Sequence, residues 1–172
     1  MIMNLDQLMK DRYSCRKFSD EPVDDRDIKA ICEAANLAPT AVNNQPFKIF
    51  VAKSDEAKKA IRANTAYHFN APVLLVVGAE PQKGWVRPFD SKNFAEVDAS
   101  IAVTHMLLKI QELGLGTTWV GHFDAPGLKK IYPEMADLEL ICVLPIGHRG
   151  CDAKPSSSHS KRKDLDELIV EL

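Results

Sequence analysis

The stretch from Ala71 to Ala79 consists of aliphatic side chains with one proline and one glycine. A strand that shows no alternation of apolar and polar positions has both faces covered. The run is far shorter than the roughly 20 apolar residues that a membrane-spanning helix needs. We therefore expect this segment to be a central strand of a sheet whose two faces are both buried.

Capping residues and apolar spacing predict the other elements. The expected helices start at Asn4, at Asp24 or Asp25, at Ser54 and at Asp124, with the longest over residues 94–113. The expected strands are 47–51, 71–79 and 138–147, and residues 117–123 are expected to form a strand or an extended turn. Pro145 has no backbone N–H to donate, so the last strand should lie at a sheet edge or carry a bulge.

The longest predicted helix is apolar nearly all round over residues 99–108. Such a helix is buried on several sides, and a second subunit could supply part of that cover. We expect a dimer on this basis, with a core helix in a monomer as the alternative. His105, inside this segment, is expected to be a buried structural histidine rather than a catalytic base.

Length and charge limit the classes of protein to consider. A chain of 172 residues with a net charge of -2 fits one domain, residues 1–172, without a basic field for nucleic acid or an anionic membrane. The four cysteines form no C-x-x-C pair, and histidine spacing predicts no metal site. With no signal-peptide pattern at residues 1–4, we expect a cytoplasmic protein with reduced thiols.

A short loop of small and amide side chains follows the second predicted helix. Pro39 and Pro46 enclose it, and each proline disfavours helical geometry at the residue before it. The segment between them should therefore be an ordered loop that presents backbone and amide donors. Such a loop suits a polar planar ligand.

A basic stretch lies near the N-terminus. Arg12 and Arg16 are four residues apart, so both could reach one phosphate, with the Ser14 hydroxyl as a further donor. The alternative is a solvated basic surface at the C-terminal end of the first helix. Residues 80–92, with Trp85 and Phe89 but no clear period, are expected to form a loop near the ligand, or else packing anchors.

The last 22 residues, after Gly150, begin polar and end apolar. The apolar end needs cover, which an arm packed across a neighbouring subunit would provide, carrying Lys161 and Arg162 near a cofactor. The alternative is a frayed basic linker followed by a short helix.

Several ordered segments resemble the FMN-dependent nitroreductase family over nearly the whole chain. They are residues 12–18 (RYSCRKF), 21–23 (EPV), 38–47 (APTAVNNQPF), 71–73 (APV), 114–117 (GLGT) and 145–147 (PIG). The resemblance implies an α+β sandwich, with a mainly antiparallel central sheet flanked by helices and a C-terminal arm that reaches the partner subunit. It also implies a homodimer with FMN at the subunit interface.

The resemblance also implies which residues contact FMN. One subunit would contribute Arg12, Tyr13, Ser14 and Arg16, and the other Pro39, Thr40, Ala41 and Asn43; Asn64, Trp119, Val120, Gly121, Lys161 and Arg162 complete the set, with His159 as a further candidate. A backbone N–H near Val120 and Gly121 would face the redox-active nitrogen. Some members have glutamate in place of Gly121, which leaves substrate preference open.

The implied function is electron transfer from NADH or NADPH to a nitroaromatic, a quinone or a related small acceptor by a ping-pong mechanism. The flavin carries this chemistry, so no catalytic triad or carboxylate pair is required. Two alternatives remain: a family branch with another substrate, such as an enone, flavin itself or a halogenated compound, and a non-catalytic FMN-binding dimer.

Overall fold

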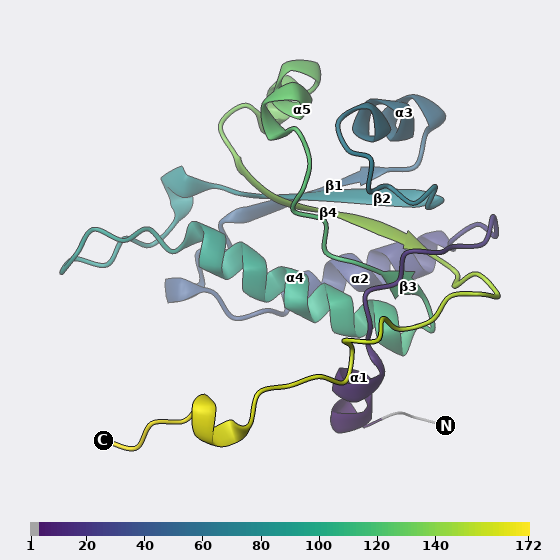
Figure 1. Ribbon diagram of the computed structural model, residues 1–172. Coiled ribbons are helices and arrows are strands. Elements are labelled where there is room, and N and C mark those ends of the chain that lie inside the picture. Colours follow the sequence, from purple (N-terminus) through teal and green to yellow (C-terminus); the bar gives the residue numbers. More distant parts are fainter. Residues whose placement is uncertain (1–3) are drawn as a thin grey trace.

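The computed structural model describes residues 4–172 and shows a four-stranded sheet between two groups of helices (Figure 1). Residues 1–3, on which the expectation of no signal peptide partly rests, lie outside the described residues. The elements are α1 (Leu5–Asp11), α2 (Asp25–Asn36), η1 (Ala41–Asn43), β1 (Phe47–Ala52), α3 (Asp55–Ala63), β2 (Val73–Ala79), η2 (Pro81–Lys83), α4 (Ala95–Glu112), β3 (Gly116–Thr117), α5 (Ala125–Ile131), η3 (Pro133–Met135), β4 (Glu139–Gly147) and η4 (Leu165–Glu167), where η denotes a short 3-10 helix. The predicted α+β sandwich is confirmed.

Four of the helices start at the residues that the sequence predicted. Asn4, Asp24, Ser54 and Asp124 each accept a hydrogen bond from an amide in the first turn of the helix that follows. These side chains satisfy amides that would otherwise have no partner inside the helix. The capping residues therefore fix where the helices begin.

The sheet has the order β1-β2-β4-β3, and all of its strand pairs are antiparallel. Every residue of β2 is buried, which confirms the central strand. Val73, Leu75 and Val77 pack against α2 and α4, whereas Leu74 and Val76 pack on the other face against α3 and α5. β2 therefore contributes buried side chains to the cores on both faces of the sheet. Burying one such side chain stabilises a protein by about 1.5–3 kcal/mol.

Of the two alternatives predicted from Pro145, the edge position was wrong, whereas the register irregularity is present in the β2–β4 pair. β4 lies between β2 and β3, and its register irregularity falls next to Gly78 rather than at Pro145. Val143 donates its N–H to Val120 O at 2.9 Å, and residues two apart in a strand face the same neighbour. The nitrogen of Pro145 therefore faces the segment that contains β3. That segment pairs with β4 only through the two residues of β3 and through Val120, so the N–H that Pro145 lacks is tolerated there.

Residues 4–172 cover one face of α4 and leave the opposite face partly open. Ala99, Val103 and Met106 are buried, but the opposite side carries Val97, which is 37% exposed, and the exposed Thr104. His105 is half-buried rather than buried as expected, because it lies on this open side, in an apolar hollow between α1, α2 and α4. No helix within residues 4–172 is long and apolar enough to cross a membrane.

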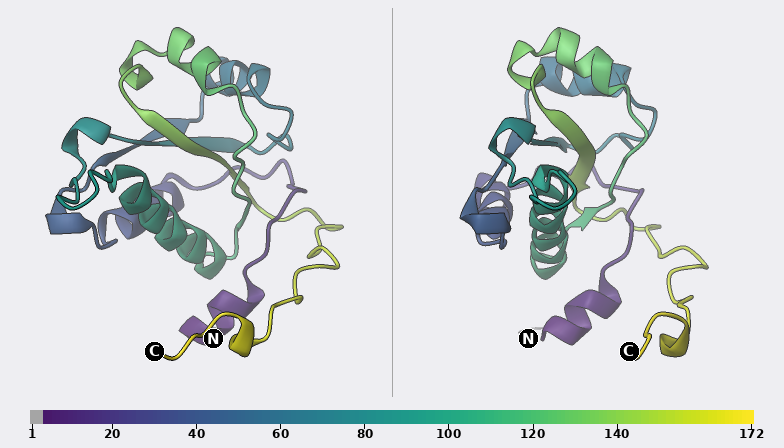
Figure 2. Two further views of the ribbon diagram at one scale, coloured as in Figure 1. Left: turned by 60° about the vertical axis from the view of Figure 1, so that its left-hand side comes forward. Right: turned by 90° about the vertical axis from the view of Figure 1, so that its left-hand side faces the viewer.

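The C-terminal segment leaves the body of the molecule (Figure 2). Its five large apolar side chains are each at least 58% exposed: Leu165, Leu168, Ile169, Val170 and Leu172. The segment has the form of an arm, and no residue among the described 4–164 buries its apolar side chains.

Candidate functional site

The basic stretch near the N-terminus is an extended segment. Its Ser14 pairs with Thr117 of β3, and its Phe18 pairs with Arg149, just after the end of β4. Cys15 donates its N–H to Thr117 O at 2.8 Å and is 1% exposed. A Cβ on Gly116 would lie 2.8 Å from Cys15 Sγ, so only glycine allows this close approach. Because alternate residues of an extended chain face opposite ways, Ser14 and Arg16 are directed away from the core.

These residues line a recess of about 200 Å³ that we call the cationic recess. Its lining is Arg12, Tyr13, Ser14, Arg16, Ser156, Ser158, His159 and Arg162, with no acidic side chain among them. Segments that are 140 residues or more apart in sequence thus meet here. The structure brings together five of the predicted site residues and the further candidate His159, whereas Lys161 is not in the lining.

Tyr13 is held in place from two sides. The Arg149 guanidinium lies 5.1 Å from the centre of its ring, and the His159 ring meets it edge-on at 6.3 Å. His159 Nε2 donates to Lys10 O at 3.0 Å. Burial raises the pKa of the Tyr13 phenol, so the hydroxyl stays protonated at neutral pH.

Arg149 was missed by sequence reasoning. Its Nη2 donates to Leu115 O at 2.9 Å and also to the Gln111 side chain, which anchors the guanidinium under Tyr13. A charged residue two positions after a buried strand was the available signal, but it does not reveal which ring the side chain supports.

A second recess, which we call the aromatic recess, adjoins the first because Arg16 lines both. It also has a volume of about 200 Å³, and its other lining residues are Tyr67, Phe69, Thr118, Trp119, Val120, Gly121 and His122. Val120 exchanges two backbone hydrogen bonds with Val143, at 3.0 and 2.9 Å. Among residues 4–172, the amides of Gly121 and His122 have no hydrogen-bond acceptor, so the two amides after the fixed Val120 are free to donate to a ligand.

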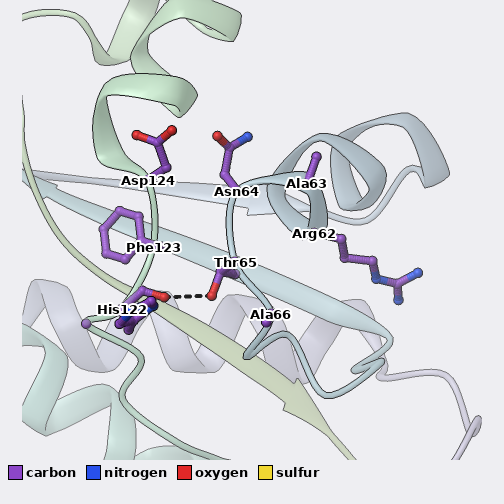
Figure 3. A pocket seen from close by; sticks show the side chains of 9 residues that line it. Arg62, Ala63, Asn64, Thr65, Ala66, His122, Phe123 and Asp124 are labelled. Carbon is purple, nitrogen blue, oxygen red and sulfur yellow. Dashed lines mark hydrogen bonds between the residues drawn. The ribbon is translucent and has the colours of Figure 1, made fainter.

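A larger pocket of about 710 Å³ lies between α3 and α5 and shares Gly121 and His122 with the aromatic recess (Figure 3). Thr65 Oγ1 donates to His122 O at 2.7 Å. This bond joins the two walls of the pocket, which are formed by residues 62–66 and 121–124. Asn64 lines this pocket, but its Nδ2 donates to Ala60 O at 2.9 Å and its side chain lies beside Asp124 (Figure 3). The side-chain amide of Asn64, which the resemblance assigned to the flavin, thus caps the C-terminal end of α3 in this structure.

The loop with Pro39, Thr40, Ala41 and Asn43 is ordered by its own hydrogen bonds. Thr40 Oγ1 accepts from Gln45 N at 3.0 Å, and Ala41 N donates at 3.0 Å to Asp98 Oδ1, a carboxylate that is 2% exposed. Three non-glycine residues of the loop, Val42, Asn43 and Gln45, have left-handed φ angles of 47°, 57° and 49°. For L-residues that conformation is unfavourable by roughly 1–2 kcal/mol each.

This loop does not join the cationic recess within one chain. Asp98 lies in the first turn of α4, whereas Thr117, which bonds Cys15, follows the end of the helix. Asp98 and Glu112, the last residue of α4, are 14 residues apart, which at 1.5 Å per residue corresponds to about 21 Å along the helix axis. The predicted site is thus two groups of residues at opposite ends of one helix.

Comparisons with known proteins identify the family of this chain. A model of the nitroreductase family matches residues 9–68 and 62–148. A provisionally named NADH dehydrogenase/NAD(P)H nitroreductase of Archaeoglobus fulgidus is 34% identical over 141 residues, covering 78% of each chain. The structure of a nitroreductase family protein from Clostridium difficile covers 98% of both chains at 31% identity, with a TM-score of 0.90.

Two further relatives bear on the ligand and the substrate. A provisionally named nitroreductase from Desulfovibrio desulfuricans, solved in complex with FMN, covers 99% of this chain and 98% of its own at 28% identity, with a TM-score of 0.80. An iodotyrosine deiodinase of Thermotoga neapolitana is 25% identical over 167 residues, which are 86% of this chain and 89% of that protein. Relatives of this chain thus act on different substrates, and the chain itself belongs to the nitroreductase family.

Proposed function

We propose that this protein is a cytoplasmic, FMN-dependent oxidoreductase that passes electrons from NADH or NADPH to a small acceptor, such as a nitroaromatic or a quinone, by a ping-pong mechanism. The observation that carries the proposal is the pair of adjoining recesses joined by Arg16. One is cationic and rich in hydroxyls, and the other is aromatic with unpaired amides.

The donor set fits FMN. Three arginines and the Ser14 hydroxyl at one end would hold a phosphate, because guanidinium groups form strong charge-assisted bonds with it. The adjoining aromatic recess would receive the ring. When bound, FMN would supply the redox chemistry, taking hydride from the nicotinamide and passing electrons to the acceptor.

The residues themselves would bind and orient. Arg12, Arg16 and Arg162 would offset the phosphate charge, while the Gly121 and His122 amides would donate to the ring edge where negative charge develops. Val120 is bonded twice to Val143, so the amide that follows it is held rigidly. A preorganised donor stabilises developing charge without reorganising during the reaction.

A homodimer would complete the site. The open face of α4 carries Val97, Ile101 and Leu108, and an isologous contact here would pair two copies of the helix in antiparallel fashion. Such pairing brings the first turn of one α4 to the end of the other. Pro39, Thr40, Ala41 and Asn43 would then face the partner's recesses, and the exposed C-terminal arm would gain apolar cover.

Asn64 and Lys161 have a weaker claim on the cofactor. Asn64 would have to release Ala60 O before its amide could face the ring. Lys161 lies next to Arg162 in the arm, outside the lining of the cationic recess, so its role depends on where the arm settles on the partner.

The test is an anaerobic absorbance titration of the FMN-loaded protein with NADH and then NADPH. We expect the flavin colour to bleach and to return when an acceptor is added. Tight FMN binding without bleaching would favour a non-catalytic FMN-binding protein. Failure to bind FMN would overturn the proposal.

A second candidate within the family is reductive dehalogenation, which the iodotyrosine deiodinase relative supports. If that function holds, iodotyrosine should reoxidise the reduced protein and release iodide, and menadione should do so poorly. The reverse order of rates would support the quinone or nitroaromatic assignment.

A further inference from the structure

The aromatic walls of the aromatic recess come from the turn between α3 and β2 and from the segment after β3. Tyr67 and Phe69 belong to that turn, and their rings lie 6.1 Å apart. Residues 80–92, expected to be a loop near the ligand or else packing anchors, line neither recess of their own chain. Trp85 packs there against Phe94 at a ring distance of 5.4 Å, so it is a packing anchor.

His122 lies where the aromatic recess meets the larger pocket, and it lines both. Its ring meets the Tyr67 ring edge-on at 5.3 Å. The Thr65 hydroxyl joins the two segments that carry these rings, because it donates to His122 O at 2.7 Å and accepts from Tyr67 N at 3.1 Å (Figure 3). Since Thr65 is only 7% exposed, this link is shielded from water. The imidazole is thus held at the boundary between the two cavities.

The ring nitrogens of His122 are available to a ligand. In the described part of the chain, hydrogen bonds engage the rings of His68 and His159, whereas the ring nitrogens of His122 have no partner. The residue is exposed to solvent. Imidazole is the side chain that takes up and releases protons near neutral pH. His122 can therefore exchange protons with solvent.

Charged and ionisable groups surround this ring on both sides. Arg16 and Tyr67 line the aromatic recess with it, and Arg62 and Asp124 line the larger pocket. The Asp124 carboxylate caps α5, and Arg62 Nη2 donates to a backbone carbonyl at 3.2 Å. Among residues 4–172, no carboxylate pairs with the His122 ring and retains its proton.

The recess has room for a planar ligand beside the imidazole. A Cβ on Gly121 would meet only Trp119 Nε1, at 4.0 Å, so the space next to His122 is open. The rings of Tyr67, Phe69 and Trp119 would pack against a flat aromatic acceptor. The imidazole would then reach a polar atom at the rim of that acceptor.

We propose that His122 is the acid that protonates a quinone acceptor as it is reduced. This inference rests on the proposed function and deepens it. The hydride that originates from NADH or NADPH supplies a quinone with both electrons but only one proton, and the hydroquinone needs a second. That proton would pass from the imidazolium to a quinone oxygen: an N–H bond breaks, an O–H bond forms, and the ring becomes neutral imidazole. Solvent would then return a proton to the exposed ring.

The first test compares two acceptors in stopped-flow reoxidation of the reduced, FMN-loaded protein. Tetramethylbenzoquinone needs a proton when it is reduced, whereas ferricyanide takes electrons alone. For His122→Gln, the ratio of the quinone rate to the ferricyanide rate should fall roughly 10- to 100-fold, a modest value for a general acid because water can replace part of its role. His148→Gln removes a half-buried imidazole outside both cavities and should keep the wild-type ratio. An unchanged ratio in His122→Gln would overturn the proposal.

Two further readouts separate proton donation from a structural role. Quinone reduction by the wild type should slow as the pH rises above neutrality, because only the protonated ring can donate, and His122→Gln should lose this dependence. Added imidazole should restore quinone reduction in His122→Ala. A His122→Gln variant that loses FMN, or that slows equally with both acceptors, would assign a structural role and overturn the proposal.

Binding can also be measured without turnover. Tetramethylbenzoquinone, whose fully substituted ring does not add to thiols such as the exposed Cys151, is added to the oxidised, FMN-loaded protein with isotope-labelled histidine. The ring C–H signal of His122 in NMR spectra, identified by its absence in His122→Gln, should shift because the quinone oxygen accepts a hydrogen bond from the ring. No shift at saturating quinone would place the acceptor elsewhere and contradict the proposal.

The two proposals fail in different ways. If the wild-type protein does not bind FMN or does not bleach with NADH or NADPH, the proposed function fails, and the role of His122 fails with it. If the wild type does both and the quinone-to-ferricyanide ratio is insensitive to His122, only the role of His122 is overturned.

Discussion

The two groups of predicted site residues differ in how far one chain completes them. Around Arg12–Arg16, segments from both ends of the sequence already meet, and the cationic recess exists in a single chain. Around Pro39–Asn43, the loop is equally ordered, yet no part of the flavin-type recesses lies beside it. The first group lines a recess within one chain, whereas the second would line one only in the proposed dimer.

This difference shows that order and completeness are separate properties of a site. Asp98, buried at the start of α4, accepts a hydrogen bond from the Ala41 N–H, and Cys15 is buried in the core. A loop with several left-handed residues is unfavourable in isolation, and such strain tends to gather where a ligand is bound. In the proposed dimer, this loop would meet the partner's recesses rather than those of its own chain.

The largest effect is expected from breaking the contact between the two copies. Thr104 is exposed at the midpoint of α4, so antiparallel pairing would place it against its own copy, and Thr104→Arg would set two cations together. We expect a monomer in sedimentation equilibrium, FMN content reduced at least tenfold by order of magnitude, and an unchanged circular dichroism spectrum. Thr104→Ser is the control.

A Thr104→Arg monomer that retains FMN would show that the recess of one chain is sufficient. The comparison between the two groups would then lose its basis. A dimer that keeps its FMN would instead move the interface away from this face of α4.

Arg16→Ala should damage the first group alone. Arg16 is the one residue that lines both recesses, and a hydrogen bond to a charged group contributes about 1.5–3 kcal/mol, so the Kd for FMN should rise roughly 10- to 100-fold. Fluorescence titration with FMN measures this, and sedimentation should still report a dimer. Arg26→Ala removes an exposed arginine that bonds only Asp24, and its Kd should match the wild type.

Thr40→Val should weaken FMN binding through the second group, the Pro39–Asn43 loop, by less than Arg16→Ala weakens it. The change keeps the shape of the side chain but removes the oxygen that accepts from Gln45 N, a bond worth about 1 kcal/mol. We expect a several-fold weaker FMN affinity and a melting temperature lower by about 2–4 °C in calorimetry. Thr40→Ser, which restores the oxygen, should recover both values; equal losses in Thr40→Ser would assign the effect to the methyl group.

The smallest effect is expected at Gly121. A Cβ there would meet only Trp119 Nε1, at 4.0 Å, and the amide would remain, so Gly121→Ala should change the free energy of unfolding by less than about 0.5 kcal/mol. At Gly127 a Cβ would lie 2.1 Å from Asn64 Oδ1 and 2.7 Å from Asp124 Oδ2, so Gly127→Ala should destabilise by about 1–2 kcal/mol. Urea unfolding separates the two.

Loss of flavin bleaching in the Gly121→Ala variant, with its stability intact, would count against a backbone contact at this position. It would mean that the ligand needs the space above Gly121 rather than its N–H.

The sequence predicted those parts of the fold that depend on neighbouring residues. Helix starts at Asn4 and Ser54 follow from a local hydrogen bond, and the burial of β2 follows from its unbroken apolar run. Pro145 was misjudged because tolerance of a missing N–H depends on how long the facing strand is, which no local pattern reveals. His105 was misjudged since apolar neighbours do not tell which face of a helix has a partner.

For the candidate site, motif and geometry contributed differently. The resemblance supplied Arg12, Ser14 and Arg16, and the fold joined them to Arg162 from the other end of the chain. Arg149 was beyond sequence reasoning, because it supports Tyr13, a residue to which no periodicity connects it.

The separation of about 21 Å along α4 has a consequence for how the protein would be maintained in a cell if the proposed dimer binds FMN. A ligand that contacts the end of one α4 and the start of the partner's α4 would recognise the dimer and not the single chain. By linkage, FMN would then tighten the dimer by the same factor by which dimerisation tightens FMN binding. Low flavin supply and dilution would both release single chains, whose exposed apolar arms proteases could reach.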